Sequence, residues 1–188
     1  MGYRLAEEAH KRKHIVTLIS GPTRFKPPKV KRFISIETAG DLLKALKREL
    51  KAADCLVMCA AVGDFRPGRI LKKKIKRRKR LSLKLFSNKD ILQELSGCKK
   101  GKLFIGFSLE TEKVIKNSYK KLKAKALDLI VANRLTKKHN VFGDKKLDVY
   151  IIDRAGSITA IKQKNKVFIA HVLLDKIEKL WYLKEGDI

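Results

Sequence analysis

The segment CLVMCAAV, residues 55–62, decides the predicted fold. An uninterrupted apolar run of this length is typical of a β-strand that is covered on both faces, as strands are in a parallel sheet. Similar runs occur in KLFIGFSLE (102–110) and DLIVAN (128–133), and amphipathic, helix-like patterns over 38–50 and 111–127 accompany them. The alternation predicts an α/β fold with a Rossmann-like, mainly parallel sheet and helices on both faces.

The flanking segments extend this pattern over residues 1–188, which we interpret as a single domain. Near the C-terminus, DVYIIDR and SITAIKQK flank Ala155-Gly156 and predict an antiparallel hairpin at the edge of the sheet. Thr38 has the residue type and position of a helix N-cap. The other predicted elements are helices over 2–13, 90–95 and 167–181, strands over 14–20 and 29–37, and a basic flap at about 70–86.

The composition is strongly basic, with 46 Lys and Arg against 19 Asp and Glu, a net charge of +27. Such a field attracts anions, which include nucleic acids and phosphorylated metabolites. A hydrophobic content of 44% is enough for a core and excludes a disordered basic tail. The run 72–80 holds most of the flap's cations and suits a contact with phosphates or a solvated, extended loop. It lacks the interleaved aromatic residues that stack on single-stranded bases.

Several classes of protein are excluded by what the sequence lacks. No apolar stretch approaches the length of a membrane-spanning helix, and the N-terminal residues do not resemble a secretion signal. We therefore expect a cytoplasmic protein with no membrane partner. Three cysteines without CxxC spacing and four scattered histidines predict neither a disulfide framework nor a zinc site.

Ligands of parallel sheets bind outside the carboxyl ends of the strands. Asp64 follows the first buried strand, where its carboxylate can orient a ligand or simply form a turn. Lys121 and Lys125 are four residues apart and project from one helix face, as solvated lysines commonly do. Taken alone, these residues leave open an enzyme site or a nucleic-acid-binding module on a Rossmann-like scaffold. The segments that deserve a search for chemistry are Gly63 to Arg69, Glu110 to Glu112 and Asn133 onward.

Taken in order, the motifs resemble the phosphopantothenate–cysteine ligase family, also called phosphopantothenoylcysteine synthetase. The resemblance runs from Met1 to about Trp181. It rests on MGYRLAEEA, TLISGPT, AAVGDFRP, the KIK that begins ten residues after Asp64, LSLKLFSNKDIL, IGFSLET, KLKAKALDLIVAN and VFG. In many bacteria this domain is the C-terminal half of a flavoprotein that also carries the phosphopantothenoylcysteine decarboxylase.

The resemblance implies a ligase that joins the carboxylate of 4′-phosphopantothenate to the amine of L-cysteine in coenzyme A biosynthesis. Bacterial members use CTP: the carboxylate attacks the α-phosphate, pyrophosphate leaves, and cysteine then displaces CMP from the acyl-cytidylate. We expect Mg²⁺ with the polyphosphate, no flavin in this chain, a homodimer, and a decarboxylase partner on the same or a separate chain. No metal ligand is assigned.

The resemblance also implies residue roles. Lys74 matches the flap lysine that helps turn over the acyl-cytidylate, and is the expected catalytic residue. The expected nucleotide contacts are Met58, Cys59, Ala60, Asp64, Lys74, Lys89, Asp90, Ile91, Leu92, Phe107, Lys121 and Lys125. Family members carry a further strand, a glycine-rich turn and an Asn-containing segment ahead of MGYRLAEEA, so we expect the domain to be incomplete at its N-terminus.

Overall fold

A five-stranded sheet forms the centre of the computed structural model, which describes residues 1–68, 73–77, 80–135 and 146–186. The strands lie in the order β3-β6-β7-β8-β9. The first three are parallel, and β8 and β9 are antiparallel to their neighbours. Their bounds are Cys55–Met58, Leu103–Glu110, Leu129–Arg134, Leu147–Asp153 and Ile158–Lys164. The predicted α/β fold and its antiparallel edge hairpin are confirmed.

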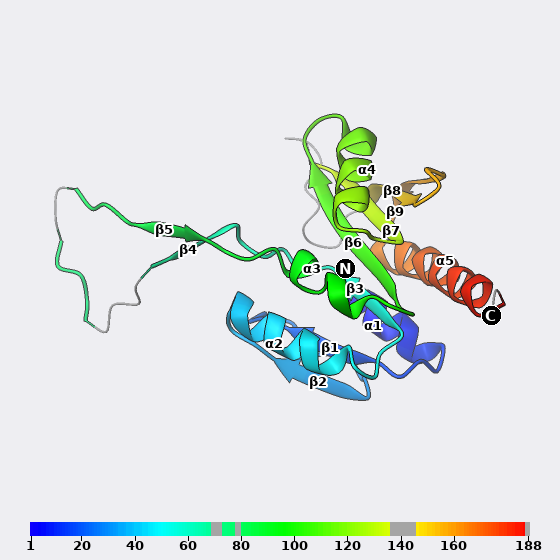
Figure 1. Ribbon diagram of the computed structural model, residues 1–188, viewed down its shortest axis with the longest axis horizontal. Coiled ribbons are helices and arrows are strands. Elements are labelled where there is room, and N and C mark those ends of the chain that lie inside the picture. The colour runs from blue at the N-terminus through cyan, green and yellow to red at the C-terminus, as the bar shows by residue number, and fades with distance from the viewer. Residues whose placement is uncertain (69–72, 78–79, 136–145, 187–188) are drawn as a thin grey trace.

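The apolar runs form strands because both faces of this sheet are covered. Ile105 and Val131 point into a core shared with α1 (Gly2–Lys11) and α5 (Lys166–Gly186). Phe104 and Ile130, one position away on the same strands, point into a second core with α2 (Ala39–Glu49) and α4 (Val114–Ala124). Since successive side chains of a strand face opposite sides, a continuous apolar run is what such a strand requires. Figure 1 shows the helices on the two sides of the sheet.

The helix ends follow local chemistry. Thr38 caps α2 as predicted: its Oγ1 accepts from the Asp41 backbone N–H at 3.1 Å, and Asp41 Oδ2 accepts from the Thr38 N–H at 3.1 Å. This reciprocal capping box satisfies two donors that the helix leaves free. α4 is shorter than the predicted 111–127, because Lys113 has a left-handed φ of 45° and the helix begins after it.

The two N-terminal strands do not join the central sheet. β1 (Thr17–Ser20) and β2 (Arg32–Ser35) form a separate parallel pair, with α2 beside them (Figure 1). Within the described residues, β1 pairs only with β2, and β3 pairs only with β6. One edge of β1 and one edge of β3 are therefore without a strand partner in that part of the chain.

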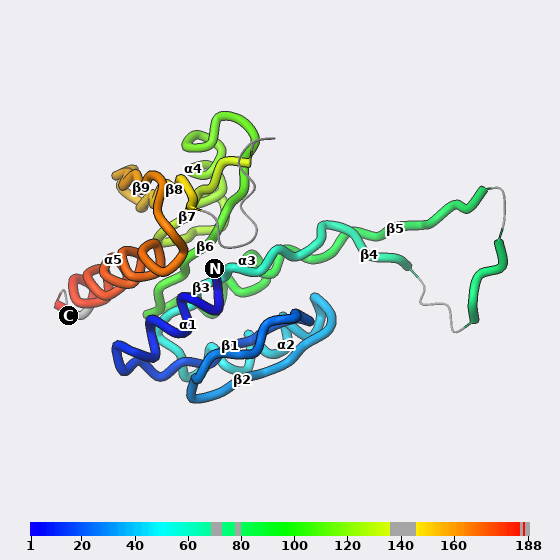
Figure 2. The backbone as a smooth tube through the Cα atoms, turned by 180° about the vertical axis from the view of Figure 1, so that it is seen from behind, coloured from blue at the N-terminus to red at the C-terminus, as the bar shows by residue number. Residues whose placement is uncertain are grey.

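A two-stranded arm extends from the body of the molecule, and both views show it standing clear of the helices (Figures 1 and 2). Its base is the antiparallel pair β4 (Phe65–Pro67) and β5 (Leu85–Ser87), and we call the described residues from Phe65 to Ser87 the arm. The arm contains the described residues of the predicted basic flap. Phe65 and Leu83 are each 64% exposed, which means that apolar side chains of the arm are not covered by this chain.

The remaining described elements are short, and part of the sequence prediction lies outside the description. α3 (Ile91–Glu94) and the 3-10 helix η1 (Ser96–Cys98) follow the arm, in agreement with the predicted helix over 90–95. The VFG motif and parts of the basic run (Lys72, Arg78, Lys79) lie outside the described residues. None of the described helices combines the length and apolar character that crossing a bilayer requires.

Candidate functional site

The carboxyl ends of the parallel strands β3, β6 and β7 meet at one edge of the sheet, where ligands of such sheets bind. β3 ends at Met58, β6 at Glu110 and β7 at Arg134. α4 follows β6 and α3 lies at the base of the arm (Figure 1). We call this region the carboxyl edge.

Lys121 points toward the carboxyl edge and forms an ion pair with Glu110. Its Nζ lies 2.7 Å from Glu110 Oε1. The Lys121 side chain is 49% exposed, whereas that of Glu110 is only 11% exposed. A buried hydrogen bond of 2.7 Å between Ser108 and Ser118 ties α4 to β6. That contact fixes the helix against the strand, so the lysine and the carboxylate face each other.

Lys125 forms a second ion pair, in which its Nζ lies 2.9 Å from Asp90 Oδ2. The other oxygen of Asp90 caps α3 by accepting from the backbone N–H groups of Leu92, at 3.1 Å, and Gln93, at 3.3 Å. Burial alone would raise the pKa of Asp90, but the hydrogen bond and charge of Lys125 and the two N–H donors outweigh it and lower the pKa. Asp90 is therefore held as a carboxylate.

The apolar residues predicted to contact the nucleotide divide between the two cores. Met58, Ile91 and Leu92 are buried together on the side of α2 and α4. Cys59 and Phe107 pack against the other core, on the side of α1 and α5. Burial raises the pKa of the Cys59 thiol to about 12, so this group is neutral and is not a nucleophile at physiological pH. Ala60, directly after Cys59, is exposed.

Asp64 and Lys89 lie at the base of the arm. The backbone carbonyl of Asp64 accepts from the Asn88 N–H at 2.7 Å, and the Asn88 side chain donates to the Gly63 carbonyl at 2.8 Å. Lys89 is exposed and pairs with Glu94 at 3.2 Å. These contacts hold the base of the arm beside α3.

Lys74 is separated from the other predicted site residues. It is exposed, and its segment, 73–77, is the piece that Figure 1 draws between the two grey stretches at the outer end of the arm. Lys121 and Lys125 lie on the body, at and after the end of α4. Within one chain, the structure brings these two lysines together with Glu110 and Asp90, and leaves Lys74 apart from them.

Comparisons with known proteins show the family to which the chain belongs. The model of a family described as the DNA/pantothenate metabolism flavoprotein C-terminal domain matches residues 1–180. The chain belongs to this family.

Relatives of the DNA/pantothenate metabolism flavoprotein C-terminal domain family are similar over nearly the whole chain. The coenzyme A biosynthesis bifunctional protein CoaBC of Borreliella burgdorferi is 38% identical over 178 residues, 93% of this chain and 44% of the relative. That of Bacillus subtilis is 35% identical over 182 residues, covering 96% and 45%. This chain thus spans less than half the length of either protein.

A solved structure of the family has the same fold. The crystal structure of the C-terminal domain of a coenzyme A biosynthesis bifunctional protein CoaBC aligns with a TM-score of 0.80 and 30% sequence identity. The alignment covers 95% of this chain and 81% of that domain. The carboxyl edge therefore belongs to an architecture that the family shares.

Two polar groups at the carboxyl edge had no role in the residue assignments made from sequence. The pairing of Glu110 with Lys121 depends on the packing of α4 on β6, which the sequence does not show. The Oδ1 atom of Asn133, near the end of β7, is buried and accepts no hydrogen bond from the described residues. The available signal was position, because both residues lie where a buried apolar strand ends.

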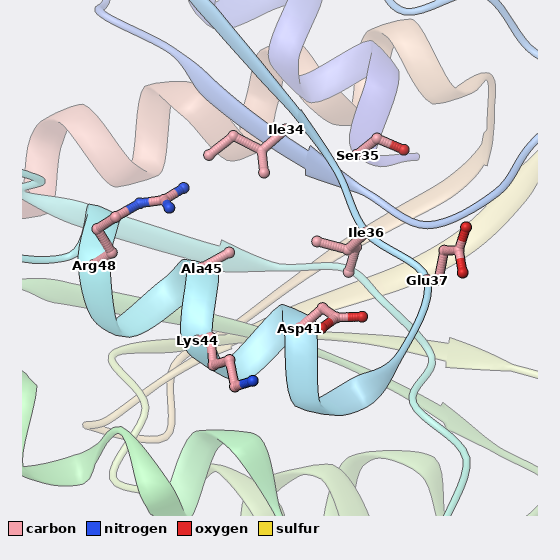
Figure 3. A pocket seen from close by; sticks show the side chains of 8 residues that line it. All are labelled: Ile34, Ser35, Ile36, Glu37, Asp41, Lys44, Ala45 and Arg48. Carbon is pink, nitrogen blue, oxygen red and sulfur yellow. The ribbon is translucent and has the colours of Figure 1, made fainter.

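A pocket of about 400 Å³ lies elsewhere, between β2 and α2 (Figure 3). Its walls combine apolar side chains with charged ones, and none is a predicted site residue: Ile34, Ser35, Ile36, Glu37, Asp41, Lys44, Ala45 and Arg48. The Asp41 carboxylate is already engaged by Thr38 in the capping box. The pocket therefore shares no lining residue with the predicted nucleotide contacts.

Proposed function

We propose that the chain carries the phosphopantothenate–cysteine ligase activity of coenzyme A biosynthesis, which forms 4′-phosphopantothenoylcysteine in the cytoplasm. The observation that supports this proposal best is the pair of lysines, Lys121 and Lys125, held at the carboxyl edge by Glu110 and Asp90. They occur in a chain of the matching family, whose relatives carry coenzyme A biosynthesis in their names.

The chemistry requires positive charge at this place. A free carboxylate is a poor electrophile, so in the proposed reaction a carboxylate oxygen attacks the α-phosphate of CTP and pyrophosphate leaves. The cysteine amine then attacks the acyl carbon of the acyl-cytidylate, and CMP leaves. Negative charge moves among phosphate oxygens in both steps. Each ammonium group has three N–H donors and a single carboxylate partner among the described residues, which leaves donors for phosphate oxygens.

The choice of CTP, rather than ATP, is part of the proposal and comes from the resemblance to bacterial members. The expected contacts with the nucleotide are those of Met58, Cys59, Ala60, Asp64, Lys74, Lys89, Asp90, Ile91, Leu92, Phe107, Lys121 and Lys125. A comparison of kcat/KM with CTP and with ATP tests this choice.

Mg²⁺ fits the site as a partner of the triphosphate. Within the described residues, no group of three or more His, Cys, Asp or Glu side chains is placed to hold a metal ion. Mg²⁺ commonly keeps water and binds through one or two carboxylates together with substrate phosphates. The exposed Asp64, directly after the β3 end, is the residue we expect to contribute a carboxylate. When bound, the ion would neutralise charge on the phosphates.

We further propose a homodimer in which the arm of one protomer contacts the other. An isolated two-stranded ribbon is marginally stable in water, and this arm exposes Phe65, Leu83 and Leu85. A second copy of the chain would cover these side chains. It would also place Lys74 at the carboxyl edge of the partner, whereas Lys74 lies apart from the carboxyl edge of its own protomer.

The two CoaBC relatives described above are each more than twice as long as this chain and are named bifunctional proteins. We propose that a phosphopantothenoylcysteine decarboxylase, on the same or a separate chain, is the partner that consumes the product.

The activity is tested by incubating the protein with 4′-phosphopantothenate, L-cysteine, CTP and Mg²⁺. The expected result is stoichiometric formation of phosphopantothenoylcysteine, CMP and pyrophosphate. Omission of L-cysteine or of 4′-phosphopantothenate should abolish CMP release. No CMP release above that of a Lys74→Gln variant would contradict the proposal.

A further inference from the structure

Glu110 is a largely buried carboxylate at the end of β6, with 11% of its side chain exposed. Its Oε1 atom is inaccessible to solvent and accepts no hydrogen bond of good geometry from the described residues; the Lys121 ammonium, 2.7 Å away, is its one charged partner among them. A buried charge is costly unless it is paired. The position of this carboxylate therefore depends on Lys121, and the position of the Lys121 ammonium depends on Glu110.

Glu110 and Lys121 differ in conformational freedom. The Glu110 backbone is held between strands: it is in register with Arg134 of β7, and its carbonyl accepts from the Leu135 N–H at 2.8 Å. Lys121, in contrast, has a long, half-exposed side chain whose only ion pair in the described residues is with Glu110. A lysine side chain has many rotamers, and ordering it costs entropy when a ligand binds. Glu110 imposes that order before the ligand arrives.

We propose that Glu110 is a positioning residue: it acts through Lys121, orienting the ammonium group toward the nucleotide phosphates. This inference rests on the proposed function. A competing effect has the opposite sign, because a carboxylate near the site repels phosphate and competes for the lysine. Positioning prevails because the ammonium has three donors, and its ion pair with Glu110 leaves donors for the ligand.

The test is the substitution Glu110→Gln, which removes the charge and keeps the shape. We expect the Kd of a CTP analogue with a methylene bridge between the α- and β-phosphates to rise about tenfold, as measured by calorimetry. We expect kcat at saturating CTP to stay within about twofold, since the residue acts on binding. Tighter binding by Glu110→Gln would show that Glu110 is a competitor and would overturn the proposal.

Glu49→Gln is the matched control. Glu49 is also a poorly exposed carboxylate, at 14%, and is ion-paired with Arg32 and Arg48. It ends α2, before the chain enters β3, so it lies at the opposite end of that strand from the carboxyl edge. We expect its Kd to match that of the wild type. An equal rise in both variants would mean a general loss of structure and would contradict positioning.

A double-mutant cycle separates action through Lys121 from a structural role. In the Lys121→Met background, Glu110→Gln should raise the Kd no further, because the group to be positioned is absent. A tenfold rise in both backgrounds would overturn the proposal. If Glu110→Gln does not fold, Glu110→Asp replaces it in the cycle, since the shorter side chain keeps the charge and moves it away from Lys121.

The proposed function and this inference fail in different ways. A wild type that binds no analogue and forms no product refutes the proposed function. A wild type that binds and turns over normally, together with an unchanged Kd in Glu110→Gln, refutes only this inference.

Discussion

The carboxyl edge and the arm differ in how much of their structure one chain provides. At the carboxyl edge, Lys121 and Lys125 have carboxylate partners within 3 Å, and these partners are fixed by a strand end and a helix cap. In the arm, Lys74 is exposed and the strands at the base are three residues each. The difference supports the proposal that one protomer supplies the binding lysines and that a second protomer supplies Lys74, the proposed catalytic residue.

The largest expected effect comes from removing both lysines of the carboxyl edge. Charge-assisted hydrogen bonds contribute about 1.5–3 kcal/mol each, so Lys121→Met with Lys125→Met should weaken CTP binding at least about a hundredfold. Calorimetry measures the Kd. Lys116→Met with Lys120→Met removes the same charge at the same spacing on exposed positions of α4 and should change the Kd by less than about threefold. An equal loss of CTP binding in both double variants would mean that net charge alone causes the effect.

The arm should respond differently, with a larger loss in catalysis than in binding. We expect Lys74→Gln to lower kcat about a hundredfold or more and to raise the Kd of the CTP analogue by less than about fivefold, because the main role proposed for Lys74 is in turning over the acyl-cytidylate. CMP release in quenched time courses gives kcat. Lys73→Gln, an equally exposed neighbour, is the control and should retain wild-type kcat. A rise in the Kd of the CTP analogue as large as the fall in kcat would mean that Lys74 acts mainly in binding, as Lys121 and Lys125 do.

Mixing inactive variants tests whether the arm acts on a partner. Lys74→Gln and the variant lacking Lys121 and Lys125 should each be nearly inactive alone. If protomers exchange randomly, half the dimers are mixed and each holds one intact site, so activity should return to about a quarter of the wild type. An absence of recovery after exchange would mean that Lys74 serves its own chain.

A smaller effect is expected from the apolar surface of the arm. Leu83→Asp should weaken the dimer about tenfold or more in sedimentation equilibrium, since it places a charge in an apolar contact. The melting temperature of the dissociated protomer should not change, because Leu83 is exposed. Ile158→Asp, at an exposed position of β9, provides the control and should leave dimerisation intact.

The smallest effect concerns the stability of the carboxyl edge. Asn is also a good N-cap, so Asp90→Asn should lose only the ion pair with Lys125, about 0.5–1 kcal/mol of unfolding free energy. The folded-state pKa of Asp90 is lowered. Its contribution is therefore present above the unfolded pKa, near 4, and is lost as the pH falls through the folded value. Urea unfolding of the two proteins should differ at pH 7 and converge at acid pH; a constant difference would exclude the ion pair as its cause.

The strands and their burial could be predicted from sequence, because a strand covered on both faces must be apolar at successive positions. Residues 55–58, 103–110 and 129–134 show this directly, and Thr38 with Asp41 fixes the start of α2. The separation of β1 and β2 from the central sheet could not be predicted, since strand pairing depends on contacts distant in sequence.

The candidate site was only partly accessible from sequence. The spacing of Lys121 and Lys125 indicated a shared helix face, but their carboxylate partners depend on packing. The burial of Phe107 on the opposite side from Ile91 follows from strand alternation combined with the sheet's position, which the motifs do not contain. The alternating apolar residues of the arm indicate strands, but they do not predict that the arm extends away from the body of the molecule.

The most direct test of the central claim follows an oxygen atom. The protein is incubated with 4′-phosphopantothenate in which both carboxylate oxygens are ¹⁸O, together with L-cysteine, CTP and Mg²⁺. The mass of the CMP product is then measured by mass spectrometry. Attack of the carboxylate on the α-phosphate, followed by displacement by the amine, leaves one labelled oxygen in CMP and one in the amide product. Unlabelled CMP would contradict the account.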